Sequence, residues 1–150
     1  MSRPASALDY AMRLLARRDH TRRELLARLS GKGFLPAESE EAVARLVAWG
    51  YLDERAIARR WVEESQTRRP RGRALVAEEL EARGIPEEIV REALSHYPPV
   101  REEKVARAAL VRLGIPLPVS PGDRPRAWRT LIRLGFPEPI VARICGIPDT

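Results

Sequence analysis

Residues 68–90, RRPRGRALVAEELEARGIPEEIV, combine an arginine-rich turn, a helical segment and a Gly-Ile-Pro break that leads into another helix. Related stretches lie on both sides: residues 17–34 read RRDHTRRELLARLSGKGF, and residues 123–141 read DRPRAWRTLIRLGFPEPIV. Gly33, Gly84 and Gly135 mark the register, since 84 − 33 and 135 − 84 both equal 51. The same interval separates three leucines and three arginines: Leu29, Leu80, Leu131, Arg22, Arg73 and Arg124. A fixed period of this kind indicates a repeat protein.

Working outward from these stretches, apolar residues recur at helical spacing, and no segment reads convincingly as a strand. Helices are predicted at 6–18, from Thr21, at 37–49, from Asp53, around 75–85, after Pro86, at 100–113, from Asp123 and after Pro137. Ser6, Asp53 and Asp123 are predicted N-caps, and Thr21-Arg22-Arg23-Glu24 has the form of a capping box. The sequence therefore predicts an all-α protein of tandem three-helix repeats.

We expect the repeats to span residues 1–52, 53–99 and 100–150. The third repeat contains a proline-rich insert at 114–123, GIPLPVSPGD, which predicts a semi-rigid linker or extended loop rather than a helix. The tryptophans at 49, 61 and 128 fall on apolar helical faces and are predicted to lie in the core rather than to stack on bases.

The composition favours a polyanionic partner, either nucleic acid or an acidic protein surface. The 150 residues include 27 basic and 21 acidic side chains, for a net charge of +6. Only Lys32 and Lys104 are lysines; the arginine bias fits bidentate recognition of phosphate and carboxylate, and equally a GC-rich coding sequence. Cys145 is the one cysteine, which excludes an intramolecular disulfide and fits a reducing cytosol. With no apolar run typical of a signal peptide or membrane span, we expect a soluble cytoplasmic protein and no membrane partner.

Catalysis finds little support in the residue inventory. The two histidines, His20 and His96, and the single cysteine have no metal-ligand spacing, and no phosphate-binding glycine loop is present. We expect no catalytic residue, no metal and no cofactor, and we expect His20 to be an ordinary surface residue.

The arginine-rich turns are the candidate binding sites. Each group flanks the N-terminus of a repeat's second helix, where free backbone N–H groups and the helix dipole favour an anion. The alternative is a solvated turn whose arginines pair with nearby carboxylates. If each repeat were a helix-turn-helix, its third helix would contact the bases. These helices contain no Asn or Gln that could recognise adenine, so sequence-specific recognition is not predicted. The predicted partner- or DNA-binding residues are Arg17, Arg18, Arg22, Arg23, Arg68, Arg69, Arg71, Arg73, Arg124 and Arg126.

Three motifs together resemble the RecX family over nearly the whole chain. GYLDER at residues 50–55, followed by Ala58, resembles the opening of that family's second repeat. Arg69-x-x-Gly72 with the later EL-x-x-x-GI at 79–85 resembles its central stretch, and RLGF at 133–136 with Ile140 resembles its third-repeat ending. The chain departs from the family in having Glu54 where many relatives have a second Asp, and in the proline-rich insert.

The resemblance implies an elongated, curved array of three-helix repeats. It also implies a non-enzymatic, monomeric regulator of DNA recombination and repair, which binds the RecA filament on single-stranded DNA. There it would inhibit the recombinase, ATPase and co-protease activities of RecA. The residues alone leave a second hypothesis open, an all-helical nucleic-acid-binding module without a recombinase partner.

Overall fold

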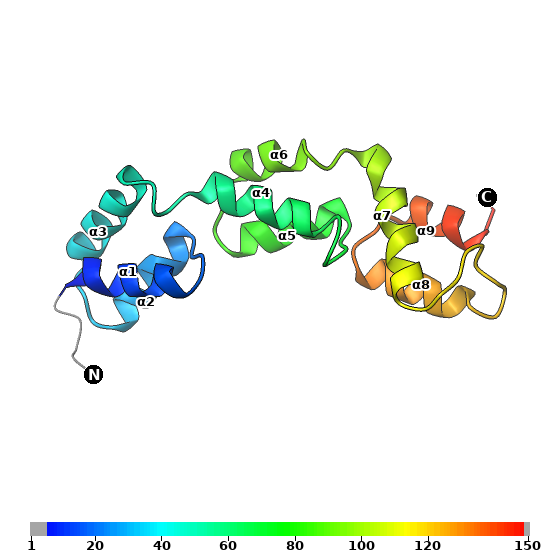
Figure 1. The fold of residues 1–150 in the computed structure, drawn as a ribbon, viewed down its shortest axis with the longest axis horizontal. Helices are drawn as coiled ribbons and strands as arrows, with labels where there is room; N and C mark the ends of the chain where they lie inside the picture. Colours follow the sequence, from blue (N-terminus) through cyan, green and yellow to red (C-terminus); the bar gives the residue numbers. More distant parts are fainter. Residues whose placement is uncertain (1–5, 149–150) are drawn as a thin grey trace.

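The structure, a computed structural model, describes residues 6–148, and these form nine helices and no strand. Figure 1 shows an elongated, curved array with the two ends of the chain at opposite ends of the molecule. The helices are α1 (Ala7–Arg17), α2 (Arg22–Gly31), α3 (Pro36–Ala48), α4 (Glu54–Glu64), α5 (Arg73–Ala82), α6 (Glu87–Leu94), α7 (Pro99–Arg112), α8 (Arg124–Arg133) and α9 (Glu138–Cys145). The all-α prediction is confirmed.

The helices pack in threes, as α1–α3, α4–α6 and α7–α9, which we call repeats 1, 2 and 3. The second helices α2, α5 and α8 are each 10 residues long and begin at equivalent arginines. The glycine that follows each helix has a positive φ, of 92° at Gly33, 93° at Gly84 and 86° at Gly135. Only glycine adopts this conformation without strain, so the glycines turn the chain toward the third helix at the same point in each repeat. Where the sequence divides between the repeats stays a prediction.

Three of the predicted caps are confirmed. The Ser6 and Asp53 side chains accept hydrogen bonds from the amides of Asp9 and Ala56, and Thr21 forms a reciprocal capping box with Glu24. Asp123 occupies the predicted N-cap position of α8, but its side chain accepts no hydrogen bond from the helix and so does not cap it.

The reason lies in the backbone at the start of α8. Asp123 has the helical dihedrals φ −88° and ψ −11° instead of the extended conformation of a capping residue. Pro125, at the second position of the helix, has no N–H to donate. The Asp123 carboxylate instead accepts from the Ser120 hydroxyl at 3.1 Å.

The hydrophobic core has two parts. Repeat 1 has its own cluster around Leu25, Leu29 and Val43. Repeats 2 and 3 share one continuous cluster that runs from Ile57 to Cys145. The repeat 2–3 junction is therefore sealed by apolar packing, whereas repeat 1 meets repeat 2 outside both clusters.

The proline-rich insert belongs to the shared core. Residues 114–123 contain no helix, as predicted. However, Ile115 is 1% exposed and Val119 is 8% exposed, and both lie in the cluster that unites repeats 2 and 3. The insert is thus a loop folded onto the core, and not a linker between separately packed units. None of the described helices has the length and apolar character needed to cross a membrane.

Candidate functional site at the junction of repeats 1 and 2

A cleft of about 440 Å³ lies where the end of α1 faces α4 and the end of α5. It brings Arg18 from the first arginine turn together with Arg69 from the second, although the two are 51 positions apart in the sequence. Two arginines outside the predicted turns, Arg60 and Arg83, complete its basic lining. We call it the inter-repeat cleft.

Arg60 ties the cleft to repeat 1 through an ion pair. Its guanidinium lies 2.7 Å from the Asp19 carboxylate, and both side chains are about half exposed, at 56% and 51%. Arg18 donates to the backbone carbonyl of Asp19 at 3.3 Å and has no carboxylate partner within the described residues. One cation of this wall is therefore unpaired, and the other holds a solvent-screened pair that contributes little to stability.

Trp61 and Arg69 form another part of the lining. The Arg69 guanidinium lies 4.4 Å from the centre of the Trp61 ring, in a cation–π contact. Arg69 and Arg68 each bind one oxygen of Glu64 at 2.7 Å. The hydrogen bond from Arg69 is the main reason that the pKa of Glu64 lies below its ordinary value. The indole N–H of Trp61 is buried and meets no acceptor in the described part of the chain.

A set of polar contacts around Arg83 joins repeats 1 and 2 beside the cleft. The Thr21 hydroxyl donates to the Arg83 carbonyl at 2.6 Å, and the Arg83 guanidinium binds Glu24 at 2.9 Å. Arg23 lies across Gly84 and donates to the carbonyl of Ala82. Burial alone would raise the pKa of Glu24, but the hydrogen bonds from Arg83 and from the Thr21 amide outweigh it and lower the pKa. Hydrogen bonds and ion pairs therefore join repeats 1 and 2.

We expected the N-termini of the second helices to attract an anion. In repeats 1 and 2 this position is already occupied by a carboxylate of the protein itself. The first amide of α2, at Arg22, donates to Glu54 of α4 at 3.2 Å. The first amide of α5, at Arg73, donates to Glu102 of α7 at 3.0 Å. In both cases the carboxylate comes from the first helix of the next repeat, so a phosphate would have to compete with it there.

The other predicted arginines lie outside the cleft. Arg71 lies 3.7 Å from the Glu79 carboxylate, and Arg73 donates to the Tyr97 carbonyl at 2.6 Å. Arg126 donates to the Leu113 carbonyl at 2.8 Å, and the Nε of Arg124 is buried without an acceptor among residues 6–148. The structure thus separates the predicted set into exposed groups and groups that pack within or between repeats. A role for the ten arginines in binding a partner stays a prediction.

Two other expectations are wrong. His20 is 2% exposed, so it is not a surface residue, and its Nδ1 lies 3.0 Å from the Arg18 carbonyl. Burial lowers the pKa of His20. Trp49 is 53% exposed and meets Tyr51 edge to face on the surface, so it is not a core residue. Trp61 and Trp128 do pack against the core.

Arg60 and Arg83 were missed because neither belongs to an arginine turn. Arg83 does carry a signal, since it precedes the repeat glycine Gly84 just as Lys32 precedes Gly33. Arg60 stands next to Trp61 on a helix that contains two arginines in succession. Only the packing of repeat 1 against α4 shows that these side chains line the same cleft as Arg18.

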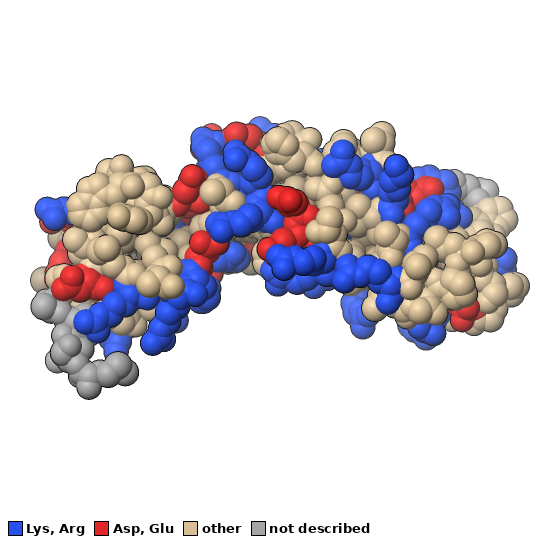
Figure 2. Space-filling view, viewed as in Figure 1, with Lys and Arg blue, Asp and Glu red and all other residues tan. Residues whose placement is uncertain are grey.

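The cleft has the character of an anion-binding site with an apolar wall. Four arginines line the cleft against two carboxylates, Asp19 and Glu64. The arginines paired with these carboxylates, Arg60 and Arg69, are both more than half exposed, so a partner's carboxylate or phosphate could reach them. Figure 2 shows basic side chains along the lower, concave edge of the molecule, interrupted by carboxylates. No group of side chains suited to holding a metal ion occurs among the described residues.

Two family models match the chain: "RecX, first three-helix domain" over residues 7–46 and "RecX, second three-helix domain" over residues 53–94. "Regulatory protein RecX" of Thermus thermophilus is 46% identical over 133 residues, covering 89% of this chain and 85% of the relative. The protein of that name from Chlorobaculum tepidum is 34% identical over 129 residues, covering 86% and 79%.

Solved structures share the fold. The crystal structure of RecX from Lactobacillus salivarius superposes with a TM-score of 0.75 at 17% identity, covering 93% of this chain and 92% of that one. A second crystal structure, of a regulatory protein RecX, gives 0.76 at 18% identity and covers 92% and 70%.

Proposed function

We propose, from the premise that this chain belongs to the RecX family of regulatory proteins, that it binds the RecA filament on single-stranded DNA. Bound there, it inhibits the recombinase, ATPase and co-protease activities of RecA, and so regulates recombination and DNA repair. It acts in the cytoplasm as a monomer and performs no chemistry of its own.

The observation that carries this proposal is the inter-repeat cleft, set in an extended array. A curved row of repeats offers a surface long enough to contact several subunits of a filament, which a compact domain of 150 residues would not. Within that surface, the cleft combines exposed guanidinium groups with a partly buried tryptophan. Arginine and tryptophan are the residues most enriched where protein interfaces concentrate their binding energy. We therefore propose that the cleft binds an acidic segment of the filament.

The direct test is ATP hydrolysis by the cognate RecA on single-stranded DNA, measured while this protein is titrated in. Inhibition at well below equimolar ratio is expected, because one bound regulator can affect a filament of many subunits. Hydrolysis that is unchanged by an excess of protein, even at low salt, would exclude the proposal.

A second measurement separates this function from that of a nucleic-acid-binding module without a recombinase partner. The affinity of the protein for single-stranded DNA alone is compared with its affinity for DNA covered by RecA. A filament regulator binds the covered DNA more tightly. A general nucleic-acid binder prefers the bare strand, and its affinity falls steeply with salt.

A further inference from the structure

A second hollow lies on repeat 2, away from the arginine turns, where α4, α6 and the start of α7 meet. Two depressions here have Arg59 and His96 in common. Arg55 and Glu92 lie on one side of this pair, and Glu63, Gln66 and Arg101 lie on the other, in a depression of about 380 Å³. Because the two depressions share Arg59 and His96, they adjoin on the surface, and we call them together the α4–α6 groove.

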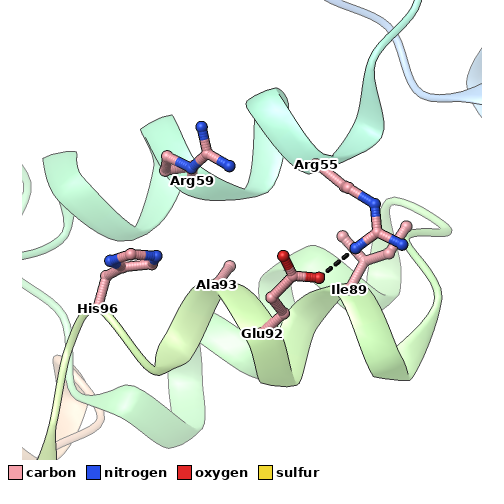
Figure 3. A pocket seen from close by; sticks show the side chains of 6 residues that line it. All are labelled: Arg55, Arg59, Ile89, Glu92, Ala93 and His96. Atoms are coloured by element: carbon pink, nitrogen blue, oxygen red, sulfur yellow. Dashed lines mark hydrogen bonds and ion pairs between the residues drawn. The ribbon is translucent and has the colours of Figure 1, made fainter.

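The middle of the groove has two unpaired donors. Figure 3 shows Arg59 on α4 and His96 beyond the end of α6, with a dashed line joining Arg55 to Glu92 but none reaching Arg59. Within residues 6–148 the guanidinium of Arg59 and the imidazole of His96 make no hydrogen bond or ion pair. The neighbouring Arg55 and Arg60 are each bound to a carboxylate, whereas the guanidinium of Arg59 is not.

The far end of the groove is held in place by a small network. Arg101 donates to the Gln66 side-chain oxygen at 2.8 Å and to the His96 carbonyl at 3.2 Å. Gln66 donates to the same carbonyl at 3.2 Å. A guanidinium has five N–H donors, so this network positions Arg101 and leaves most of its donors free for a ligand.

The lining indicates a hydrophilic anion as the ligand. Arg55 neutralises Glu92. The two positive charges of Arg59 and Arg101 exceed the single negative charge of Glu63, so the lining is positive overall. Ile89 and Ala93 are the apolar residues of the lining, and no tryptophan, tyrosine or phenylalanine contributes to it. The groove thus lacks the aromatic anchor that a protein hot spot or a stacked base requires. Arginine, by contrast, matches the geometry of phosphate oxygens.

We propose that the α4–α6 groove binds a phosphate group of a nucleic-acid backbone, with Arg59 and His96 at its centre and Arg101 beside them. Such contacts fix the position of a strand without reading its sequence. The inference goes beyond the filament proposal and does not depend on it. It places a DNA contact on a different face of α4 from the face that lines the inter-repeat cleft.

The first test compares two charge reversals that alter the net charge equally. Arg59→Glu removes the central cation of the groove, and Arg45→Glu changes an exposed arginine on α3, outside the groove. Binding of a fluorescent single-stranded oligonucleotide is measured by anisotropy over a range of salt concentrations. Arg59→Glu should weaken binding about tenfold at low salt and flatten the slope of log K against log salt by about one. Arg45→Glu should change the affinity less than about twofold.

The second test removes the other central donor of the groove. His96→Ala deletes the imidazole that lies beside Arg59 in both depressions, and should weaken oligonucleotide binding at low salt about threefold.

The outcomes separate the possible ligands. If Arg59→Glu and His96→Ala both weaken binding of the oligonucleotide and Arg45→Glu does not, the groove holds a strand. If Arg59→Glu weakens binding of ATP but leaves the oligonucleotide unaffected, the phosphate comes from a free nucleotide and the strand is excluded. If Arg59→Glu behaves like Arg45→Glu with both probes, the proposal is overturned. Loss of RecA inhibition with DNA affinity intact would assign the groove to a protein surface, and would leave the filament proposal standing.

Discussion

Gly72, just before α5, lies against the backbone of Gly135, just after α8. The Gly72 amide donates to the Leu134 carbonyl at 2.8 Å, and a Cβ placed on Gly72 would lie 2.1 Å from the Gly135 oxygen. Real Cβ atoms do not approach backbone this closely, so only glycine fits at position 72 while repeats 2 and 3 stay in contact. Gly72 also follows the arginine turn of repeat 2, which explains why a glycine interrupts that run of arginines.

Gly72→Ala should therefore destabilise the protein by about 3 kcal/mol, since the added methyl group forces the two backbones apart and disturbs the hydrogen bond. Gly122→Ala is the matched control, because a Cβ there meets nothing within 4 Å. Its free energy of unfolding should stay within about 0.5 kcal/mol of the parent. Urea denaturation of the two variants measures the difference. Equal stability would mean that repeats 2 and 3 do not touch at this point.

The two predicted aspartate caps should differ in their contribution to stability. The Asp53 carboxylate accepts from the Ala56 amide at 3.1 Å, so Asp53→Ala should cost about 1 kcal/mol. Asp123 caps nothing in α8, and Asp123→Ala removes only an exposed contact with Ser120. Its effect should be below about 0.5 kcal/mol. Thermal unfolding followed by circular dichroism measures both, and a larger loss for Asp123→Ala would contradict the observed cap geometry.

His20 should make the protein less stable in mild acid. Its pKa is lowered in the folded state, mainly by burial, so the unfolded chain binds the proton more tightly. The stability that His20 contributes is therefore complete above its unfolded value of 6.5 and is lost as pH falls from there toward the folded pKa. The free energy of unfolding is measured between about pH 7.5 and about pH 5.

Matched variants identify the histidine responsible. His20→Gln should remove the histidine part of this slope, even if the substitution lowers stability throughout the range. His96→Gln makes the same substitution at an exposed histidine and serves as the matched control. A slope that persists in His20→Gln would exclude His20 as its source.

The sequence predicted those features that recur every 51 residues. The second helices, the three glycines and the buried leucines at 29, 80 and 131 all repeat in register, and each leucine is fully buried. Features that depend on how repeats meet were not predictable in this way. The inter-repeat cleft joins the end of α1 to α4 and α5, and His20 is buried although its neighbours Arg18 and Asp19 are exposed.

Composition misled in the same regions. The proline-rich insert has the sequence of a linker, yet Ile115 and Val119 enter the core that repeats 2 and 3 share. Trp49 has a helical core spacing, but it follows the last residue of α3 and projects from the surface beside Tyr51. Hydrophobic periodicity shows which face of a helix is apolar, but it does not show how much of that face other helices cover.

The inter-repeat cleft makes the sharpest functional prediction. Arg60→Glu reverses a cation of the cleft and breaks its pair with Asp19, whereas Arg45→Glu reverses one on α3 and breaks its pair with Glu41. The two arginines are equally exposed, at 56% and 55%, and both pairs are solvent-screened, so each variant should keep the parent's stability within about 0.5 kcal/mol.

Binding to the RecA filament should separate the two variants. If the cleft receives an acidic segment, Arg60→Glu introduces a like-charge contact and should raise the concentration needed for half-inhibition of RecA ATPase about tenfold or more. Arg45→Glu should leave it within about twofold, which controls for the loss of net positive charge. Equal inhibition by both variants would exclude the cleft as the contact surface, even if the parent protein inhibits RecA. The arginine turns outside the cleft would then be the next residues to reverse.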